Sequence, residues 1–134
     1  MPSYSSTPLA KKLGFKEGTR YLLIAAPAGF DRELAPLPAT AVAMPPRAPA
    51  ADVIVFFAAN QKILSSHLAA LIKKLPPAGA LWIGWPKQAS GVATDLRETV
   101  VRDTLLATGL VDIKVCSIND TYSGLKFVRR LEDR

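Results

Sequence analysis

The chain has 134 residues, of which 49% are hydrophobic, and its formal net charge is +6. This length fits one domain, residues 1–134, with a core large enough to need no disulfide or metal. Cys116 is the only cysteine, which excludes an intramolecular disulfide and a thiolate metal cluster.

The N-terminus and the apolar runs bear on location. Met1–Thr7 is polar and no signal-peptide core follows it. The longest apolar runs, such as Val53–Ala59, fall far short of the ~20 residues that a membrane span needs. We therefore expect a cytoplasmic protein with no membrane partner.

The excess positive charge is spread along the sequence. Adjacent basic residues occur as pairs, and no run of four or more is present. Cations in the last turn of a helix complement its dipole, which explains two of these pairs without a ligand. A nucleic-acid partner is therefore not favoured. The pairs are Lys11-Lys12, Lys73-Lys74 and Arg129-Arg130.

In the first third of the chain the pattern predicts short elements. Thr7-Pro8 has the residue types of an N-cap and first helical position, for a helix ending at Gly14. Thr19–Ala26 predicts a buried strand and Phe30–Leu34 a helical turn. Within the Ala/Pro-rich connection that follows, Thr40–Met44 predicts a short strand at a sheet edge.

From residue 52 the pattern is stronger. Buried strands are predicted at Asp52–Ala59 and Ala80–Trp85, and an apolar stripe predicts a helix over Gln61–Leu75, with Asn60 as its N-cap. A second long helix is predicted over Asp95–Thr108, where Asp95 and Glu98 have capping-box spacing. A hairpin follows, with strands predicted at Val111–Ile118 and Leu125–Arg130. In the first of these, Val111, Ile113 and Val115 alternate and are expected to share one apolar face.

Strands that alternate with long helices predict right-handed crossovers and a mainly parallel sheet. The expected fold is α/β: a three-layer, Rossmann-like sandwich with about six strands and a C-terminal antiparallel hairpin.

Several segments resemble class I methyltransferases. Asp52-Val53-Ile54-Val55 is similar to their Asp-led fourth strand, and residues 75–83, LPPAGALWI, are similar to their LKPGGxLxI passage into the fifth strand. Gly109-Leu110-Val111-Asp112 resembles the GF step before the sixth. This resemblance covers about the last two-thirds of the chain and implies a methyltransferase-like domain.

A closer resemblance covers nearly the whole chain. The segments YSSTPLAKKLGFKEG, WPKQASGVATDL and GLVDIKVCSINDTYSGLKFV are similar to a family of small bacterial proteins classified as domain of unknown function 3052. That resemblance implies a compact Rossmann-like protein, but it implies no activity.

The sequence departs from the methyltransferase pattern where the enzymes bind S-adenosylmethionine. After the first strand, Ile24–Phe30 has one glycine instead of three and a proline that lacks an N–H. The second strand ends in Ala43-Met44-Pro45 and offers no carboxylate for ribose hydroxyls. Each unpaired hydroxyl would cost about 1–3 kcal/mol. We therefore expect no cofactor, with S-adenosylmethionine disfavoured.

Ligands of open α/β sheets bind at the carboxyl ends of the parallel strands. The loop Trp85–Asp95 is the most unusual segment expected there, because it combines an aromatic ring, a cation, a hydroxyl and a flexible glycine. Structural roles explain most of these residue types equally well, and Asp95 fits an N-cap better than a catalytic base. Neither metal ligands nor a catalytic constellation is predicted. The candidate ligand-binding residues are Pro27, Gly29, Asn60, Trp85, Lys87, Ser90, Gly91, Asp120 and Tyr122.

Three functions remain open. The favoured one is a non-catalytic domain that binds an unidentified small molecule or a protein at the carboxyl edge. The first alternative is an S-adenosylmethionine-dependent methyltransferase with an atypical cofactor loop. The second is a binder of anions or nucleic acid that uses Lys87 and the basic pairs. A homodimer through the exposed edge near residues 40–44 is a further alternative.

Overall fold

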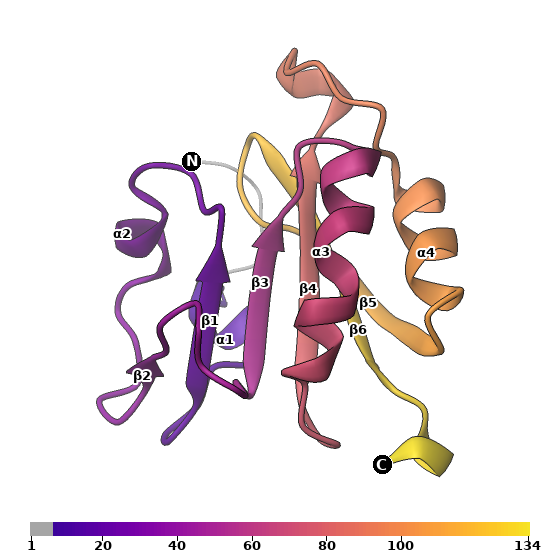
Figure 1. Ribbon diagram of the computed structural model, residues 1–134. Helices are drawn as coiled ribbons and strands as arrows, with labels where there is room; N and C mark the ends of the chain where they lie inside the picture. Colours follow the sequence, from indigo (N-terminus) through magenta and orange to yellow (C-terminus); the bar gives the residue numbers. More distant parts are fainter. Residues whose placement is uncertain (1–6) are drawn as a thin grey trace.

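The computed structural model describes residues 7–134 as a central sheet with helices on both sides (Figure 1). The helices are α1 (Leu9–Lys12), α2 (Phe30–Leu34), α3 (Gln61–Lys73) and α4 (Glu98–Leu106). The strands are β1 (Arg20–Ile24), β2 (Val42–Ala43), β3 (Val53–Phe57), β4 (Ala80–Pro86), β5 (Leu110–Ser117) and β6 (Tyr122–Arg129). Short 3₁₀ turns lie at Gln88–Ser90 and Leu131–Asp133.

The six strands form one sheet in the order β2-β1-β3-β4-β6-β5. Neighbouring strands from β2 to β4 are parallel, whereas β6 is antiparallel to both β4 and β5. The predicted three-layer α/β fold with a C-terminal antiparallel hairpin is confirmed. The chain moves from β1 to β2 on one side and returns to β3 on the other, so strand order reverses at the boundary between β1 and β3.

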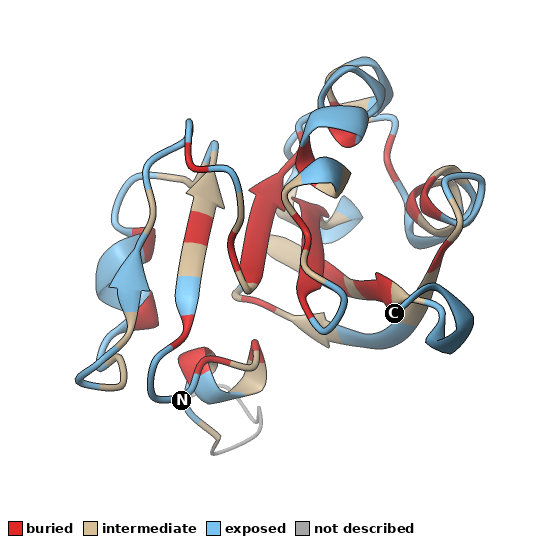
Figure 2. Cartoon of the chain, turned by 60° about the horizontal axis from the view of Figure 1, so that its bottom comes forward, coloured by how far each residue is buried: buried red, intermediate tan, exposed pale blue. Residues whose placement is uncertain are grey.

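Alternate residues of β3 serve two hydrophobic cores. Ile54 and Phe56 face α3 and α4, whereas Val53, Val55 and Phe57 face α1 and α2. Because helices cover both faces, every residue of β3 and β4 is buried, as the continuous apolar runs predict (Figure 2). The predicted cap of α3 is confirmed, since the side-chain oxygen of Asn60 accepts a hydrogen bond from the Ile63 N–H at 2.9 Å.

Two predicted helix starts are wrong. Helix α1 begins at Leu9, one residue later than predicted, with Pro8 at the N-cap position and no side-chain cap. Helix α4 begins at Glu98, and Arg97 occupies its N-cap position without a side-chain hydrogen bond. The predicted capping box with Asp95 does not form, because the Asp95 carboxylate instead accepts a hydrogen bond from the Gln61 N–H at the start of α3.

A β-bulge interrupts the expected alternation in β5. The register with β6 shifts between Asp112 and Lys114, which leaves Ile113 without a partner on the neighbouring strand. Ile113 and Val115, predicted to share one apolar face with Val111, are 56% and 50% exposed. No helix among residues 7–134 is long and apolar enough to cross a membrane.

Candidate functional site

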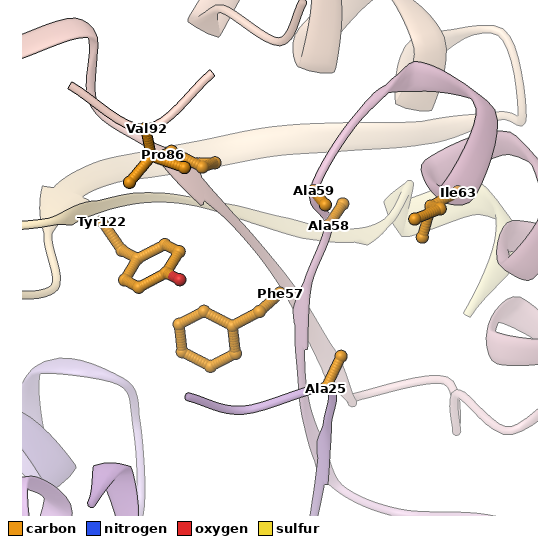
Figure 3. Close-up of a pocket in the computed structure, with 8 residues that line it drawn as sticks. All are labelled: Ala25, Phe57, Ala58, Ala59, Ile63, Pro86, Val92 and Tyr122. Atoms are coloured by element: carbon orange, nitrogen blue, oxygen red, sulfur yellow. The ribbon is translucent and has the colours of Figure 1, made fainter. Parts of the chain in front are cut away.

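A pocket of about 210 Å³ opens at the carboxyl ends of β1, β3 and β4, where strand order reverses (Figure 3). This is the position at which open α/β sheets bind ligands. Its walls are almost entirely apolar, and Tyr122 supplies the polar side chain among them. The lining residues are Ala25, Phe57, Ala58, Ala59, Ile63, Pro86, Val92 and Tyr122.

Two aromatic rings form one side of the pocket. Phe57 and Tyr122 meet edge to face, with ring centroids 5.1 Å apart and an interplanar angle of 82° (Figure 3). Phe57 is held from behind by Phe30 of α2, whose ring lies 4.8 Å away. Edge-to-face contacts of this kind fix ring orientation. The pocket therefore has a preformed aromatic wall against which a planar group can pack.

The backbone at the end of β1 is strained. Ala25 has a φ of 57°, and it is the non-glycine residue with positive φ among residues 7–134. A β-carbon in the left-handed region costs about 1–2 kcal/mol, so the surrounding structure must impose this conformation. The sequence lacks the glycines expected after the first strand, yet the chain still makes the left-handed turn that a glycine would favour.

Replacing Ala25 with glycine is therefore expected to stabilise the protein. Removing the β-carbon relieves the left-handed strain, which should raise the free energy of unfolding by about 0.5–1 kcal/mol, despite the entropy that glycine adds to the unfolded chain. Urea unfolding followed by circular dichroism measures the change. The neighbouring Ala26 has no positive φ, so Ala26→Gly should instead destabilise. Equal losses for the two variants would contradict the strain.

The loop before α4 is fastened to the start of α3 beside the pocket. Asp95 accepts a hydrogen bond from the Gln61 N–H at 2.8 Å, and the Thr94 hydroxyl donates to the Ala59 carbonyl at 2.7 Å. The N–H groups of Gln61 and Ile63 at the start of α3 therefore donate to side chains of the same protein, Asp95 and Asn60. The Thr94 contact holds Ala59 in place as a pocket wall.

Of the candidate residues in the 85–91 loop, Trp85 and Lys87 line another cavity, of about 220 Å³, beside the start of α4, whereas Ser90 and Gly91 do not line it. Trp85 is 5% exposed and belongs to the core under α3 and α4. The Lys87 ammonium donates to the Ser117 hydroxyl at 2.6 Å, and the Ser90 hydroxyl donates to the Lys87 carbonyl at 2.6 Å. Gly91 ends the 3₁₀ turn with a φ of 79°.

The other candidate residues occupy turns at the same edge of the sheet. The Pro27 carbonyl accepts from the Phe30 N–H, and Gly29 begins α2 with a φ of 83°. Asp120 is exposed in the turn between β5 and β6. Of the predicted set, Tyr122 lines the pocket and Asn60 borders it. That these nine residues bind a ligand stays a prediction.

Sequence reasoning missed Ala25 and Phe57. Phe57 stands in a continuous apolar run whose pattern does not distinguish a pocket wall from core. Ala25 has no distinguishing residue type, and its conformation depends on tertiary contacts. The one available signal was position, because both residues end strands predicted to be parallel neighbours.

No group of three or more metal-ligating side chains is present in the described part of the chain. His67 is exposed on α3, and its Nδ1 lies 2.9 Å from the Ile63 carbonyl. Burial raises the pKa of the Cys116 thiol, while the charges of Lys12, Lys114 and Lys87 oppose that rise. A raised pKa disfavours the reactive thiolate. Neither side chain therefore points to metal or nucleophilic chemistry.

Solved structures share this fold. A complex of DhpI with S-adenosylhomocysteine aligns with a TM-score of 0.62 at 11% identity, covering 92% of this chain and 84% of that chain. Ribosomal protein L11 methylase of Lactobacillus delbrueckii subsp. bulgaricus aligns with a TM-score of 0.61 at 11% identity, covering 91% of this chain and 75% of that chain. Aeropyrum pernix fibrillarin with bound S-adenosyl-L-methionine aligns with a TM-score of 0.58 at 14% identity, covering 90% of this chain and 73% of that chain.

No protein-family model matches the sequence, and no curated protein matches it either. The resemblance to domain of unknown function 3052 therefore rests on the quoted segments. The expectation that the chain takes no cofactor is overturned, because structures of the same fold are complexes with S-adenosylmethionine or its demethylated product. At these identities the likeness shows the architecture alone, and the chain has the mixed α/β fold of S-adenosylmethionine-dependent methyltransferases.

Proposed function

We propose that this protein binds S-adenosylmethionine in the pocket at the carboxyl ends of β1, β3 and β4 and acts as a methyltransferase with an atypical cofactor loop. The carrying observation is the strained Ala25 at the mouth of that pocket. Strain of this kind persists where surrounding structure enforces it, which is frequent at ligand sites. The shared fold supports this function over a non-catalytic ligand- or protein-binding domain.

The pocket residues fit part of the cofactor well. Phe57 and Tyr122 offer an aromatic wall for the adenine ring, and Ala58, Ala59 and Ile63 offer small apolar surfaces for the methylthioether chain. The Tyr122 hydroxyl can donate or accept one hydrogen bond. These contacts would orient the cofactor and exclude water from its methyl group. When bound, S-adenosylmethionine supplies an electrophilic methyl group.

The ribose and the amino-acid end have weaker anchors. No carboxylate lines the pocket, and β2 ends in an alanine. A hydrogen bond to a charged group contributes about 1.5–3 kcal/mol, so its absence should weaken binding roughly ten- to a hundredfold. Backbone groups near Ala25 and Ala59 would have to serve the hydroxyls. We therefore expect affinity in a weaker range than a carboxylate-bearing site would give.

Thermal unfolding with and without S-adenosylmethionine or S-adenosylhomocysteine tests this function. Ligand at one hundred times its dissociation constant should stabilise the fold by about 2.7 kcal/mol, which is several degrees at this chain length. Because binding is expected to be weak, the titration should extend to several millimolar. Adenosine and methionine, added separately, are the controls and should shift the melting temperature less. Absence of a shift at saturating cofactor would contradict the proposal.

A further inference from the structure

The fold brings together lysines that lie about 100 residues apart in the sequence. Lys12 belongs to α1 and Lys16 to the turn after it, whereas Lys114 and Lys126 belong to β5 and β6. The ammonium of Lys12 reaches across to the Ser117 carbonyl at the end of β5, 3.0 Å away. We call these four residues the lysine patch.

Three members of the lysine patch, Lys16, Lys114 and Lys126, lie close together. Lys114 and Lys126 are direct partners in the antiparallel register of β5 and β6, where facing side chains lie ~5 Å apart at their β-carbons. Lys16 and Lys126 line one cavity of about 150 Å³. Gly14 lies against it, and a β-carbon there would come within 3.8 Å of the Lys126 ammonium.

The nearby acidic side chains do not neutralise the lysine patch. Asp52 lines the same cavity, but the Arg20 guanidinium bonds it at 3.0 Å and 3.3 Å and lowers the pKa of that carboxyl. Asp112 pairs with Arg102. Among residues 7–134, the ion pairs all involve arginines and none includes a member of the lysine patch.

Uncompensated like charges oppose folding. Like charges directly across a strand pair are destabilising. Burial lowers the pKa of Lys126, and the neighbouring charges of Lys114 and Lys16 lower it further. An anion held by the lysine patch would relieve both effects, because it would supply the missing negative charge. The cavity also contains the buried Thr19, whose hydroxyl accepts from the Lys16 N–H and keeps its own proton to donate.

We propose that the lysine patch binds successive phosphates of a single-stranded nucleic acid without reading its sequence. Four ammonium groups spread along α1 and the β5–β6 ribbon suit a ligand with several phosphates better than one compact anion. Lysines act as point charges that contact phosphate groups without reading the bases. Backbone contacts of this kind carry affinity without sequence preference.

Fluorescence anisotropy with a labelled mixed-sequence single-stranded RNA, at ionic strengths from 50 to 300 mM, measures this binding. With four phosphates neutralised, log Kobs should fall against log salt with a slope of about −2.8. The double variant Lys114→Gln/Lys126→Gln should reduce the slope to about −1.4 and weaken binding at every salt concentration. A DNA oligonucleotide of the same sequence should bind comparably.

The matched control is Lys62→Gln/Lys73→Gln, which removes the same charge from exposed positions of α3 on the opposite face of the sheet. It should bind RNA as the wild-type protein does. Equal weakening by both double variants, absence of RNA binding, or binding of tripolyphosphate but not of the oligonucleotide would each overturn the proposal. The cofactor-dependent melting shift should be the same in all three proteins, so this proposal and the methyltransferase proposal can fail separately.

Discussion

Replacing Trp82 with alanine should lower the free energy of unfolding by about 3–5 kcal/mol, the largest loss of stability expected from one substitution here. Trp82 lies at the centre of β4, is fully buried, and packs in the core under α1 and α2. Its indole N–H also donates to the Leu13 carbonyl at 2.9 Å, which fastens the end of α1 to the sheet. Truncation removes the ring and leaves that buried carbonyl without its donor. Chemical denaturation followed by circular dichroism measures the loss.

Two further variants separate these contributions. Trp82→Phe keeps an aromatic ring in the core and removes the donor, so it should cost less, about 1–3 kcal/mol from the unsatisfied Leu13 carbonyl plus part of the packing. Leu131→Ala provides the matched control, because Leu131 is 80% exposed and should change stability by less than ~0.5 kcal/mol. A loss below ~1 kcal/mol for Trp82→Ala would contradict the central position of this side chain.

The sequence predicts the elements whose signals are local and strong. The continuous apolar run that becomes β3 needs only its own residues to indicate a strand covered on both faces, and the structure buries all of it. Asn60 and the apolar stripe after it predict α3 equally well, because capping and amphipathicity act within one element. The alternation of strands and helices then predicts right-handed crossovers and a mainly parallel sheet, whereas the strand order is known only from the structure.

Elements that depend on distant partners are harder to predict. The spacing of Asp95 and Glu98 favours a capping box, but Asp95 finds the Gln61 N–H on another element and α4 starts later. The bulge beside Ile113 similarly depends on how β5 meets β6. In both cases a tertiary contact replaces the local contact that the sequence pattern favours. The local spacing of residues carries no information about that tertiary contact.

The functional features show the same division. The pocket edge could be located because parallel strands place their carboxyl ends together, and Tyr122 was found on that basis. The strain at Ala25 could not be predicted from the sequence, since alanine is compatible with any ordinary backbone conformation. The adjacent basic pairs in the sequence do not indicate the lysine patch. Lys16, Lys114 and Lys126 are isolated in sequence, and only the packing of α1 against the β5–β6 ribbon brings them together with Lys12.

Filling the pocket should abolish cofactor binding while leaving the fold intact. Ala59 lines the pocket at the end of β3 and is exposed, so Ala59→Trp places an indole in much of the roughly 210 Å³ without displacing buried core (Figure 3). The ligand-free melting temperature should change by no more than about 2–4 °C, within the range of ordinary surface substitutions. The shift with S-adenosylhomocysteine should disappear.

Ala70→Trp is the matched control for this variant, because Ala70 is exposed on α3 and is not among the residues that line the pocket. It should keep the full shift with S-adenosylhomocysteine. If Ala59→Trp also keeps that shift, the cofactor binds elsewhere on the protein and the pocket at Ala25 is not its site. If the wild-type protein and Ala70→Trp both respond and Ala59→Trp does not, the strained turn, the aromatic wall and the cofactor belong to one site, because a single side chain between them removes the response.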